Sequence, residues 1–237
     1  MVFVLVHGGG FSGSCWDLLI PLLDGTVYAV DLPGRGDRPA DLSTVTVQGS
    51  VDAVADVITD NHLTDVVLVG HSMAGLTLPG VAERVPSRLR RLVFVSCTVP
   101  AHGTSLAQTL ADLSPTVGEL SEHIGQADLV ADGRGVLHSV VAGEMFCNDM
   151  DDQLTRFTLD RMVPEALGIL GEPCDLTGLR HPVPRTYVRL TRDATVSLEA
   201  QDAMIANLGG AEVVDLDSGH MAMISHPGQL AALVNQG

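Results

Sequence analysis

The chain has 237 residues, of which 46% are hydrophobic and 18% charged, and this composition predicts a well-buried globular fold and argues against disorder. Its formal net charge of −16 excludes a surface that attracts nucleic acid or an anionic membrane. All 13 basic residues are arginine, which excludes Schiff-base chemistry and a phosphate-loop lysine.

Six short runs of β-forming residues are spread along the chain and predict six strands, at residues 2–8, 26–31, 66–70, 91–97, 186–190 and 212–216. The runs are continuously apolar rather than alternating, as in parallel strands that helices cover on both faces. Segments with helical spacing separate them. In the segment 50–63, for example, one face carries Val51, Val54, Ala55 and Ile58. This repetition predicts an α/β fold with a mostly parallel six-stranded sheet and right-handed crossovers.

The first predicted strand ends in a glycine-rich stretch, His7-Gly8-Gly9-Gly10, called the glycine turn below. The stretch lacks the G-x-G-x-x-G spacing of a dinucleotide site and the G-K-[ST] of a phosphate loop. Its backbone N–H groups can instead face a developing oxyanion, and Gly9 is the candidate donor. Met1 leads directly into this strand without a basic segment, an apolar stretch and a cleavage site, so we expect a cytoplasmic protein.

The third predicted strand runs into Gly-His-Ser-Met-Ala-Gly, residues 70–75. An ordinary strand-to-helix turn is one reading. The other is a nucleophile elbow, in which Ser72 has a positive φ and small residues, here Gly70 and Ala74, let strand and helix pass closely. The following helix would direct its first N–H groups toward the serine, and Met73 would supply the second oxyanion donor. The pattern therefore favours Ser72 as a nucleophile.

The segment 100–184, called the insert below, contains no convincing strand, only helical fragments at 105–113, 151–162 and 164–170. Because the strand–helix alternation resumes afterwards, the insert predicts a helical lid between two core parts, 1–99 and 185–237, rather than a separate domain. A pocket above the serine would be lined by Met145, Phe146, Phe157, Met162 and Leu167, although each could be plain core. The insert carries few basic residues, which favours a neutral, apolar ester or a lactone.

The fifth and sixth predicted strands are followed by a carboxylate and a histidine, Asp193 and His220. This gives the chain order serine, acid, histidine that such folds use. Asp215 and Asp217 are rivals but lie too close to His220 in sequence, and Asp65 precedes its strand. We therefore predict that Asp193 orients His220, which acts as the general base.

The four cysteines are far apart and form no C-x-x-C pair: Cys15, Cys97, Cys147 and Cys174. They predict free thiols in a reducing compartment rather than a disulfide framework or a zinc motif. No apolar run approaches the length of a membrane span. We expect no metal, no cofactor and no membrane partner.

Four segments together resemble the α/β-hydrolase superfamily: "VLVHGGGFSGSCWDLLIPLL" (4–23), "AVDLPGRGDRP" (29–39), "LVGHSMAGL" (68–76) and "LDSGHMAMISHP" (216–227). They are most similar to the compact branch of plant methyl-ester esterases, hydroxynitrile lyases and bacterial esterases. Trp16 stands where that branch has its tryptophan. The resemblance implies the α/β-hydrolase fold and frames nearly the whole chain except the insert.

The resemblance also implies roles for individual residues: Ser72 as nucleophile, His220 as general base and acid, Asp193 as orienting carboxylate, and the N–H groups of Gly9 and Met73 as the oxyanion hole.

Two departures from the branch narrow the chemistry. The lyases have a threonine where this chain has Gly8 and a lysine where it has Met221, so cyanohydrin cleavage is not expected. A haloalkane dehalogenase would need an aspartate in place of Ser72.

The sequence thus predicts a serine hydrolase that cleaves a small, neutral, largely apolar ester or lactone through an acyl-serine. One alternative is a thioesterase or a tailoring or cyclising enzyme of secondary metabolism with the same fold. Another is a receptor-like member that binds a ligand and hydrolyses it slowly. The oligomeric state stays open.

Overall fold

The computed structural model describes residues 1–113, 128–130, 134–136 and 139–236. Its centre is one sheet of β1 (Val2–Val6), β2 (Thr26–Val30), β3 (Val66–His71), β4 (Leu89–Val95), β8 (Arg185–Leu190) and β9 (Glu212–Leu216). The strand order is β2-β1-β3-β4-β8-β9, and every neighbouring pair is parallel. Val4, for instance, pairs with Tyr28 on one side and Leu68 on the other. The predicted parallel six-stranded sheet is confirmed.

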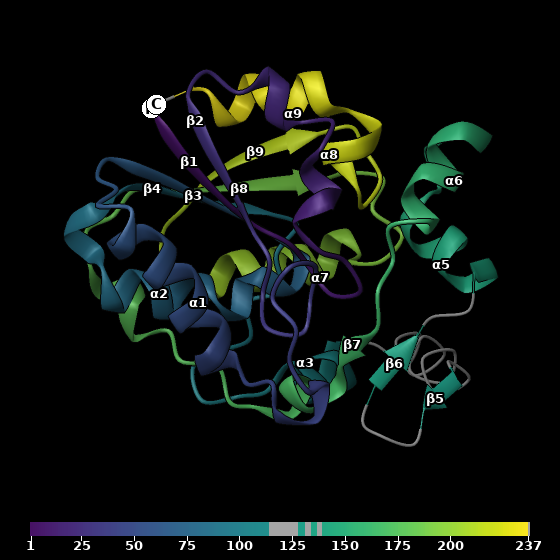
Figure 1. Ribbon diagram of the computed structural model, residues 1–237, viewed down its shortest axis with the longest axis horizontal. Coiled ribbons are helices and arrows are strands. Elements are labelled where there is room, and N and C mark those ends of the chain that lie inside the picture. Colours follow the sequence, from purple (N-terminus) through teal and green to yellow (C-terminus); the bar gives the residue numbers. More distant parts are fainter. Residues whose placement is uncertain (114–127, 131–133, 137–138, 237) are drawn as a thin grey trace.

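Helices cover both faces of this sheet (Figure 1). One face packs against α1 (Val47–Asp60), α2 (Leu78–Arg84) and α7 (Leu198–Asn207), and the other against α8 (Ala222–Ser225) and α9 (Pro227–Val234).

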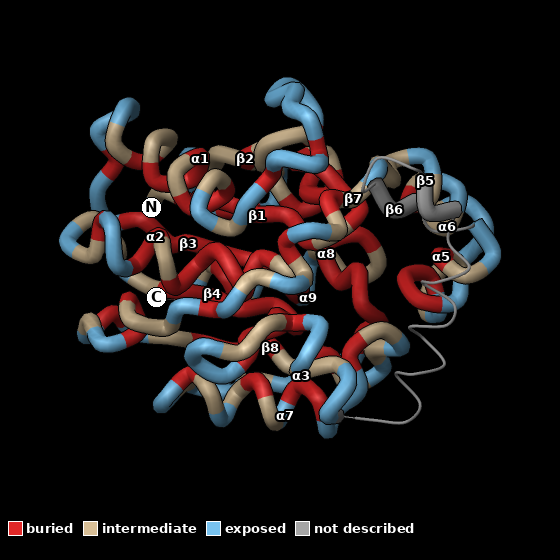
Figure 2. The backbone as a smooth tube through the Cα atoms, turned by 90° about the horizontal axis from the view of Figure 1, so that it is seen from below, coloured by how far each residue is buried: buried red, intermediate tan, exposed pale blue. Residues whose placement is uncertain are grey.

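Successive residues of a strand therefore enter different cores. In β1, Val4 and Val6 belong to the first core and Phe3 and Leu5 to the second, and all four are fully buried. Figure 2 shows the central strands as a buried layer between more exposed loops. Burial of each such side chain contributes about 1.5–3 kcal/mol, which explains why the strand runs are apolar throughout.

In sequence, the insert lies between β4 and β8. In space, it lies beside the end of the sheet to which β8 and β9 point (Figure 1). Its described helices are α3 (Leu106–Leu113), α5 (Ser139–Phe146) and α6 (Asp152–Leu159). It also contains a small antiparallel sheet of β5 (Asp128–Val130), β6 (Arg134–Val136) and β7 (Glu165–Ala166).

The prediction of an entirely helical insert is therefore wrong in one respect. The fragment 164–170 is not an α-helix but the two-residue strand β7 followed by a 3-10 turn, Leu167–Gly171. Strands of two or three residues are too short to show an alternating pattern, so the sequence holds no signal for them. The description of the insert as a lid stays a prediction.

All four cysteines are buried and form no disulfide, as predicted. Across the described ranges, no helix is both long enough and apolar enough to cross a membrane.

Candidate active site

Ser72 lies where β3 gives way to the 3-10 turn Ser72–Leu76, and its φ of 53° is in the left-handed region. Neighbouring side-chain and backbone atoms leave little room for a Cβ on either side of the serine. A Cβ on Gly70 would lie 2.6 Å from a methyl carbon of Leu78, and a Cβ on Gly75 would lie 2.3 Å from the Thr98 carbonyl oxygen. The turn thus has the backbone strain and the small neighbours that a nucleophile elbow requires.

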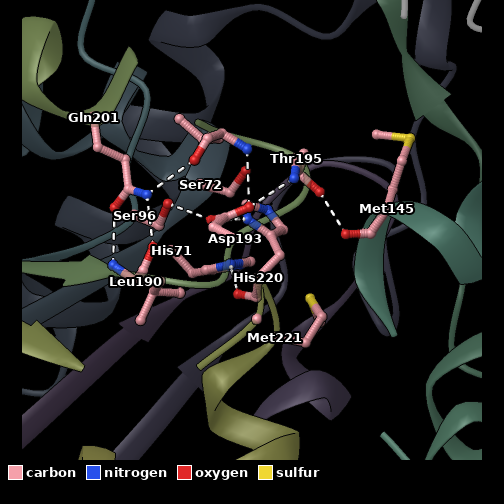
Figure 3. Close-up of polar contacts among 12 residues, drawn as sticks. His71, Ser72, Ser96, Met145, Leu190, Asp193, Thr195, Gln201, His220 and Met221 are labelled. Carbon is pink, nitrogen blue, oxygen red and sulfur yellow. Dashed lines mark hydrogen bonds and ion pairs between the residues drawn. The ribbon is translucent and has the colours of Figure 1, made fainter. Parts of the chain in front are cut away.

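His220 and Asp193 form a buried pair in the loops after β9 and β8 (Figure 3). The two atoms in contact, His220 Nδ1 and Asp193 Oδ2, are 2.7 Å apart, and the side chains are 1% and 0% exposed. The hydroxyl of Ser96 also donates to Oδ2, at 2.6 Å, and the N–H groups of Thr195 and Val196 donate to Oδ1. The carboxylate is therefore fully surrounded by donors.

These donors decide the charge of the carboxyl group. Burial by itself would raise the pKa of Asp193, but the charge of His220 and the hydrogen bonds from His220, Ser96 and Val196 outweigh it and lower the pKa below its ordinary value. An ionised Asp193 keeps the proton of His220 on Nδ1 and leaves Nε2 free to accept one.

The ring of His220 contacts two other rings. Its centroid lies 4.5 Å from that of His71, the residue before Ser72, and Phe146 stacks on it at 5.6 Å. His71 Nε2 also bonds to the carbonyl oxygen of His220, at 2.9 Å. In the part of the chain that the structure describes, no hydrogen bond joins the Ser72 hydroxyl to His220. Catalytic contacts of this kind often tighten only when substrate binds.

His71 does not compete with His220 for the role of base. It is buried, and burial, followed by the charge of the neighbouring His220, holds the pKa of His71 well below its ordinary value. His71 is therefore neutral at pH 7 and serves as a packing surface for His220.

Two backbone N–H groups beside the serine are free. Among the described residues, neither the N–H of Gly9 nor that of Met73 has an acceptor, whereas the N–H of Gly10 donates to Glu165 Oε2 at 2.8 Å. The glycine turn approaches the serine so closely that a Cβ on Gly8 would lie 2.8 Å from the Ser72 Cβ. The first N–H groups of a helical turn have no partner within that turn, which accounts for the one on Met73.

A cavity that is partly open to solvent lies over Ser72, between the core and the insert. Four of the predicted lining residues do line it: Met145, Phe146, Met162 and Leu167. Other described lining residues, which the sequence did not suggest, are Leu106, Leu110, Val163, Glu165, Leu170, Thr98, Thr195 and Val196. Packing of the insert on the core brings them together, so no local pattern marks them.

Phe157 is a correction to the predicted pocket, because it lies outside the described residues that line the cavity. The guanidinium carbon of Arg161 instead lies 3.4 Å from the centroid of its ring. Arg161 follows four positions later on the same stretch of chain, so this cation–π contact is local. The ring of Phe157 thus contacts a residue just after the end of α6 rather than the pocket.

The insert also forms hydrogen bonds with the two loops that carry Asp193 and His220. The Asn148 side-chain amide donates to the carbonyl oxygen of Arg192, next to Asp193, at 2.7 Å. The carboxylate of Asp149 accepts the N–H of Gly219, next to His220, at 2.6 Å. No sequence pattern marks either residue, since only the folded insert brings them to these loops.

The rival carboxylates are used elsewhere, in ion pairs at the surface: Asp65 with Arg90, Asp215 with Arg189 and Asp217 with Arg192. Among the residues that the structure describes, no three histidine, cysteine, aspartate or glutamate side chains form a group that could hold a metal ion.

Known proteins resemble the chain over nearly its whole length. The sequence matches the family described as "Alpha/beta hydrolase family" over residues 3–233. The carbendazim hydrolyzing esterase of Nocardioides sp. (strain SG-4G) is 32% identical over 97% of this chain and 96% of its own. Methylesterase 17 of Arabidopsis thaliana is 26% identical over 98% and 89% of the two chains. A solved extracellular alpha/beta-hydrolase from a Paenibacillus species superimposes with a TM-score of 0.86 at 24% identity, over 98% and 97% of the two chains.

Proposed function

The chain belongs to the alpha/beta hydrolase family, and on that premise we propose that it is a serine hydrolase of a small, neutral, largely apolar carboxylic ester or lactone. The observation that carries the proposal is the buried contact of 2.7 Å between His220 and Asp193, in loops next to a strained Ser72 that opens into a cavity. This is the arrangement that activates a serine.

The reaction would proceed through an acyl-serine. Ser72 Oγ attacks the carbonyl carbon while His220 Nε2 accepts the hydroxyl proton, and the N–H groups of Gly9 and Met73 bind the resulting oxyanion. His220 then gives its proton to the leaving alcohol. In the second half, His220 takes a proton from water, which attacks the acyl-serine and releases the acid. Each oxyanion donor would contribute a factor of about 10²–10³ in rate.

The cavity wall supports an apolar substrate, since most of the described lining side chains are aliphatic, aromatic or thioether groups. The charged side chain among them is the carboxylate of Glu165, which disfavours an anionic substrate. The relative at 32% identity is named a carbendazim hydrolyzing esterase, and the relative at 26% identity is named a methylesterase. Both names support a small-molecule ester as the substrate class.

Hydrolysis of p-nitrophenyl acetate and butyrate tests the proposal, together with labelling by a fluorophosphonate probe. Wild type should turn over at least one ester and take up the label. Ser72→Ala should lose the label and on the order of 10⁴-fold or more in kcat, because the nucleophile is gone, while its thermal unfolding stays that of a folded protein. Folded wild type that neither hydrolyses an ester nor takes the label would overturn the proposal. Labelling without ester turnover would favour the thioesterase or tailoring enzyme.

A further inference from the structure

The insert forms two hydrogen bonds with the glycine turn at Gly10. This residue has a φ of 73° and is bonded on both sides of its backbone by one short segment of the insert. The N–H of Val163 donates to the Gly10 carbonyl oxygen at 2.9 Å, and the Gly10 N–H donates to Glu165 Oε2 at 2.8 Å. Both partners lie far from Gly10 in sequence, Glu165 by 155 residues. The orientation of the peptide group next to Gly9 therefore depends on the insert.

Glu165 is itself held by a cation. Its Oε1 forms an ion pair with Arg35 and also accepts the N–H of Ala166, at 2.7 Å. The Arg35 side chain is 3% exposed and that of Glu165 13%. Burial raises the pKa of Glu165, and the charge of Arg35 opposes this effect. A buried carboxylate without such a partner is strongly unfavourable.

The pair stands at the edge of the proposed oxyanion site. Glu165 lines the same cavity as Gly9 and Ser72, and its Oε2 lies 3.2 Å from the position that a Cβ on Gly9 would take. A negative charge so close to the Gly9 N–H would repel an oxyanion unless it is neutralised, because repulsion between like charges is stronger beside a largely apolar wall than in water.

We propose that Glu165 is a positioning residue for the oxyanion hole, and that Arg35 neutralises it. Glu165 accepts a hydrogen bond from the Gly10 N–H and so fixes the glycine turn, which leaves the Gly9 N–H free to bind substrate. Arg35 removes the repulsion that the Glu165 carboxylate would otherwise exert on the oxyanion. The inference rests on the acyl-serine mechanism proposed above.

Other ionisable groups near the pair do not replace Arg35. His7 lies with Arg35 and Glu165 around a small hollow behind the glycine turn, and burial lowers the pKa of His7 to about 4, so it is neutral at pH 7. The Asp31 carboxylate accepts the N–H groups of Gly13 and Asp37 and has no ion pair with Arg35 among the described residues.

Substitutions in the pair separate charge from hydrogen bonding. At a pH where Glu165 is ionised, Arg35→Met should lower kcat by about 10²–10³-fold with KM nearly constant, because an unpaired carboxylate then faces the oxyanion. Glu165→Gln, which keeps an acceptor for Gly10 without the charge, should lose less than tenfold. The double variant Arg35→Met with Glu165→Gln should regain most of the loss of the single Arg35→Met. Arg84→Met, which breaks two arginine–aspartate pairs on the surface, is the control and should keep wild-type activity.

A second readout is the inhibition constant of an aryl trifluoromethyl ketone, compared with the alcohol of the same skeleton. Ser72 Oγ bonds to the ketone carbon, its proton passes to His220, and the carbonyl oxygen becomes an oxyanion; the alcohol forms no adduct. Arg35→Met should raise the inhibition constant of the ketone by about 10²-fold and leave that of the alcohol unchanged. Loss of a purely structural ion pair would not produce this difference. The activity of Arg35→Met should also fall as pH rises through the pKa of Glu165, because the carboxyl group then becomes charged. This fall should be absent from the double variant, which has no carboxyl group at position 165.

Arg35→Met could fail to fold, so Glu165→Ala against Glu165→Gln gives an independent test. Both variants lack the charge, but only Glu165→Ala also lacks the acceptor for the Gly10 N–H. Its kcat should therefore be at least tenfold below that of Glu165→Gln, at a similar KM. Equal kcat and equal ketone inhibition in these two variants would overturn the inference, as would a folded Arg35→Met with wild-type ketone inhibition. Wild-type turnover and fluorophosphonate labelling, measured in parallel, show separately whether the hydrolase proposal itself fails.

Discussion

Asp193 shows how much one side chain depends on its donors. Four groups donate to its two oxygens, and the His220 contact is the one that selects the tautomer of the imidazole. Because Nδ1 carries the proton, Nε2 is the atom that can receive one from Ser72. The role of Asp193 is therefore tested by a change that keeps its shape and alters only its donors and acceptors.

Asp193→Asn should lower kcat on the order of 10⁴-fold, since an amide group directed at Nδ1 favours the opposite tautomer. The measurement is steady-state hydrolysis of the ester that wild type turns over best. Asp217→Asn changes a rival carboxylate whose side chain is 78% exposed and should keep wild-type kcat. A kcat for Asp193→Asn within tenfold of wild type would show that another group orients His220.

At the scale of elements, two glycines differ in whether the structure has room for a Cβ. Gly75 follows Ser72 in the elbow, and a Cβ there would lie 2.3 Å from the backbone oxygen of Thr98. Gly143 lies within α5, and a Cβ there would meet nothing within 4 Å. The first glycine is required by close approach, whereas the second only weakens its helix.

Gly75→Ala should lower the free energy of unfolding by about 1–3 kcal/mol, the usual cost of overpacking. Gly143→Ala should raise it by about 0.5–1 kcal/mol, because alanine restricts the unfolded chain and favours the helix. Urea unfolding curves with equal slopes measure both changes. The same sign for the two variants would contradict this account of the elbow.

The insert is the element that sequence patterns described least well. Its helices were predicted from apolar spacing, but β7 is two residues long and pairs with β6 through the backbone, so residues 165–166 carry no strand pattern. Yet β7 is what carries Glu165 to the glycine turn. The functional contribution of the insert thus depends on its least predictable part.

At the scale of the whole molecule, buried neutral histidines make stability depend on pH. Burial lowers the pKa of His7 to about 4, while the unfolded chain keeps the ordinary value of about 6.5. Between these values the unfolded state binds a proton that the folded state does not. The free energy of unfolding must therefore decrease as pH falls from about 6.5 to about 4.

His7 should account for about 3 kcal/mol of this decrease. Urea unfolding at pH 7 and pH 4.5 measures it, and His7→Gln should show a smaller difference between the two pH values than wild type. Some dependence should remain in that variant because the pKa of His71 is also lowered by burial. His102→Gln changes an exposed histidine and should keep the wild-type difference; an equal difference in His7→Gln would contradict the assignment.

The sequence by itself determined the architecture and the position of the serine. Continuous apolar runs mark strands buried on both faces, and a serine between small residues marks a turn with positive φ, because both properties depend on a few adjacent residues. Tertiary structure alone decided that Phe157 packs under Arg161 rather than in the pocket, that Gly10 is occupied while Gly9 is free, and that Arg35 meets Glu165. The contact of Phe157 is local, but no sequence pattern says whether its ring meets Arg161 or the pocket. The contacts of Gly10 and Arg35 join residues that are distant in sequence, and only the packing of the insert on the core brings their atoms within bonding distance.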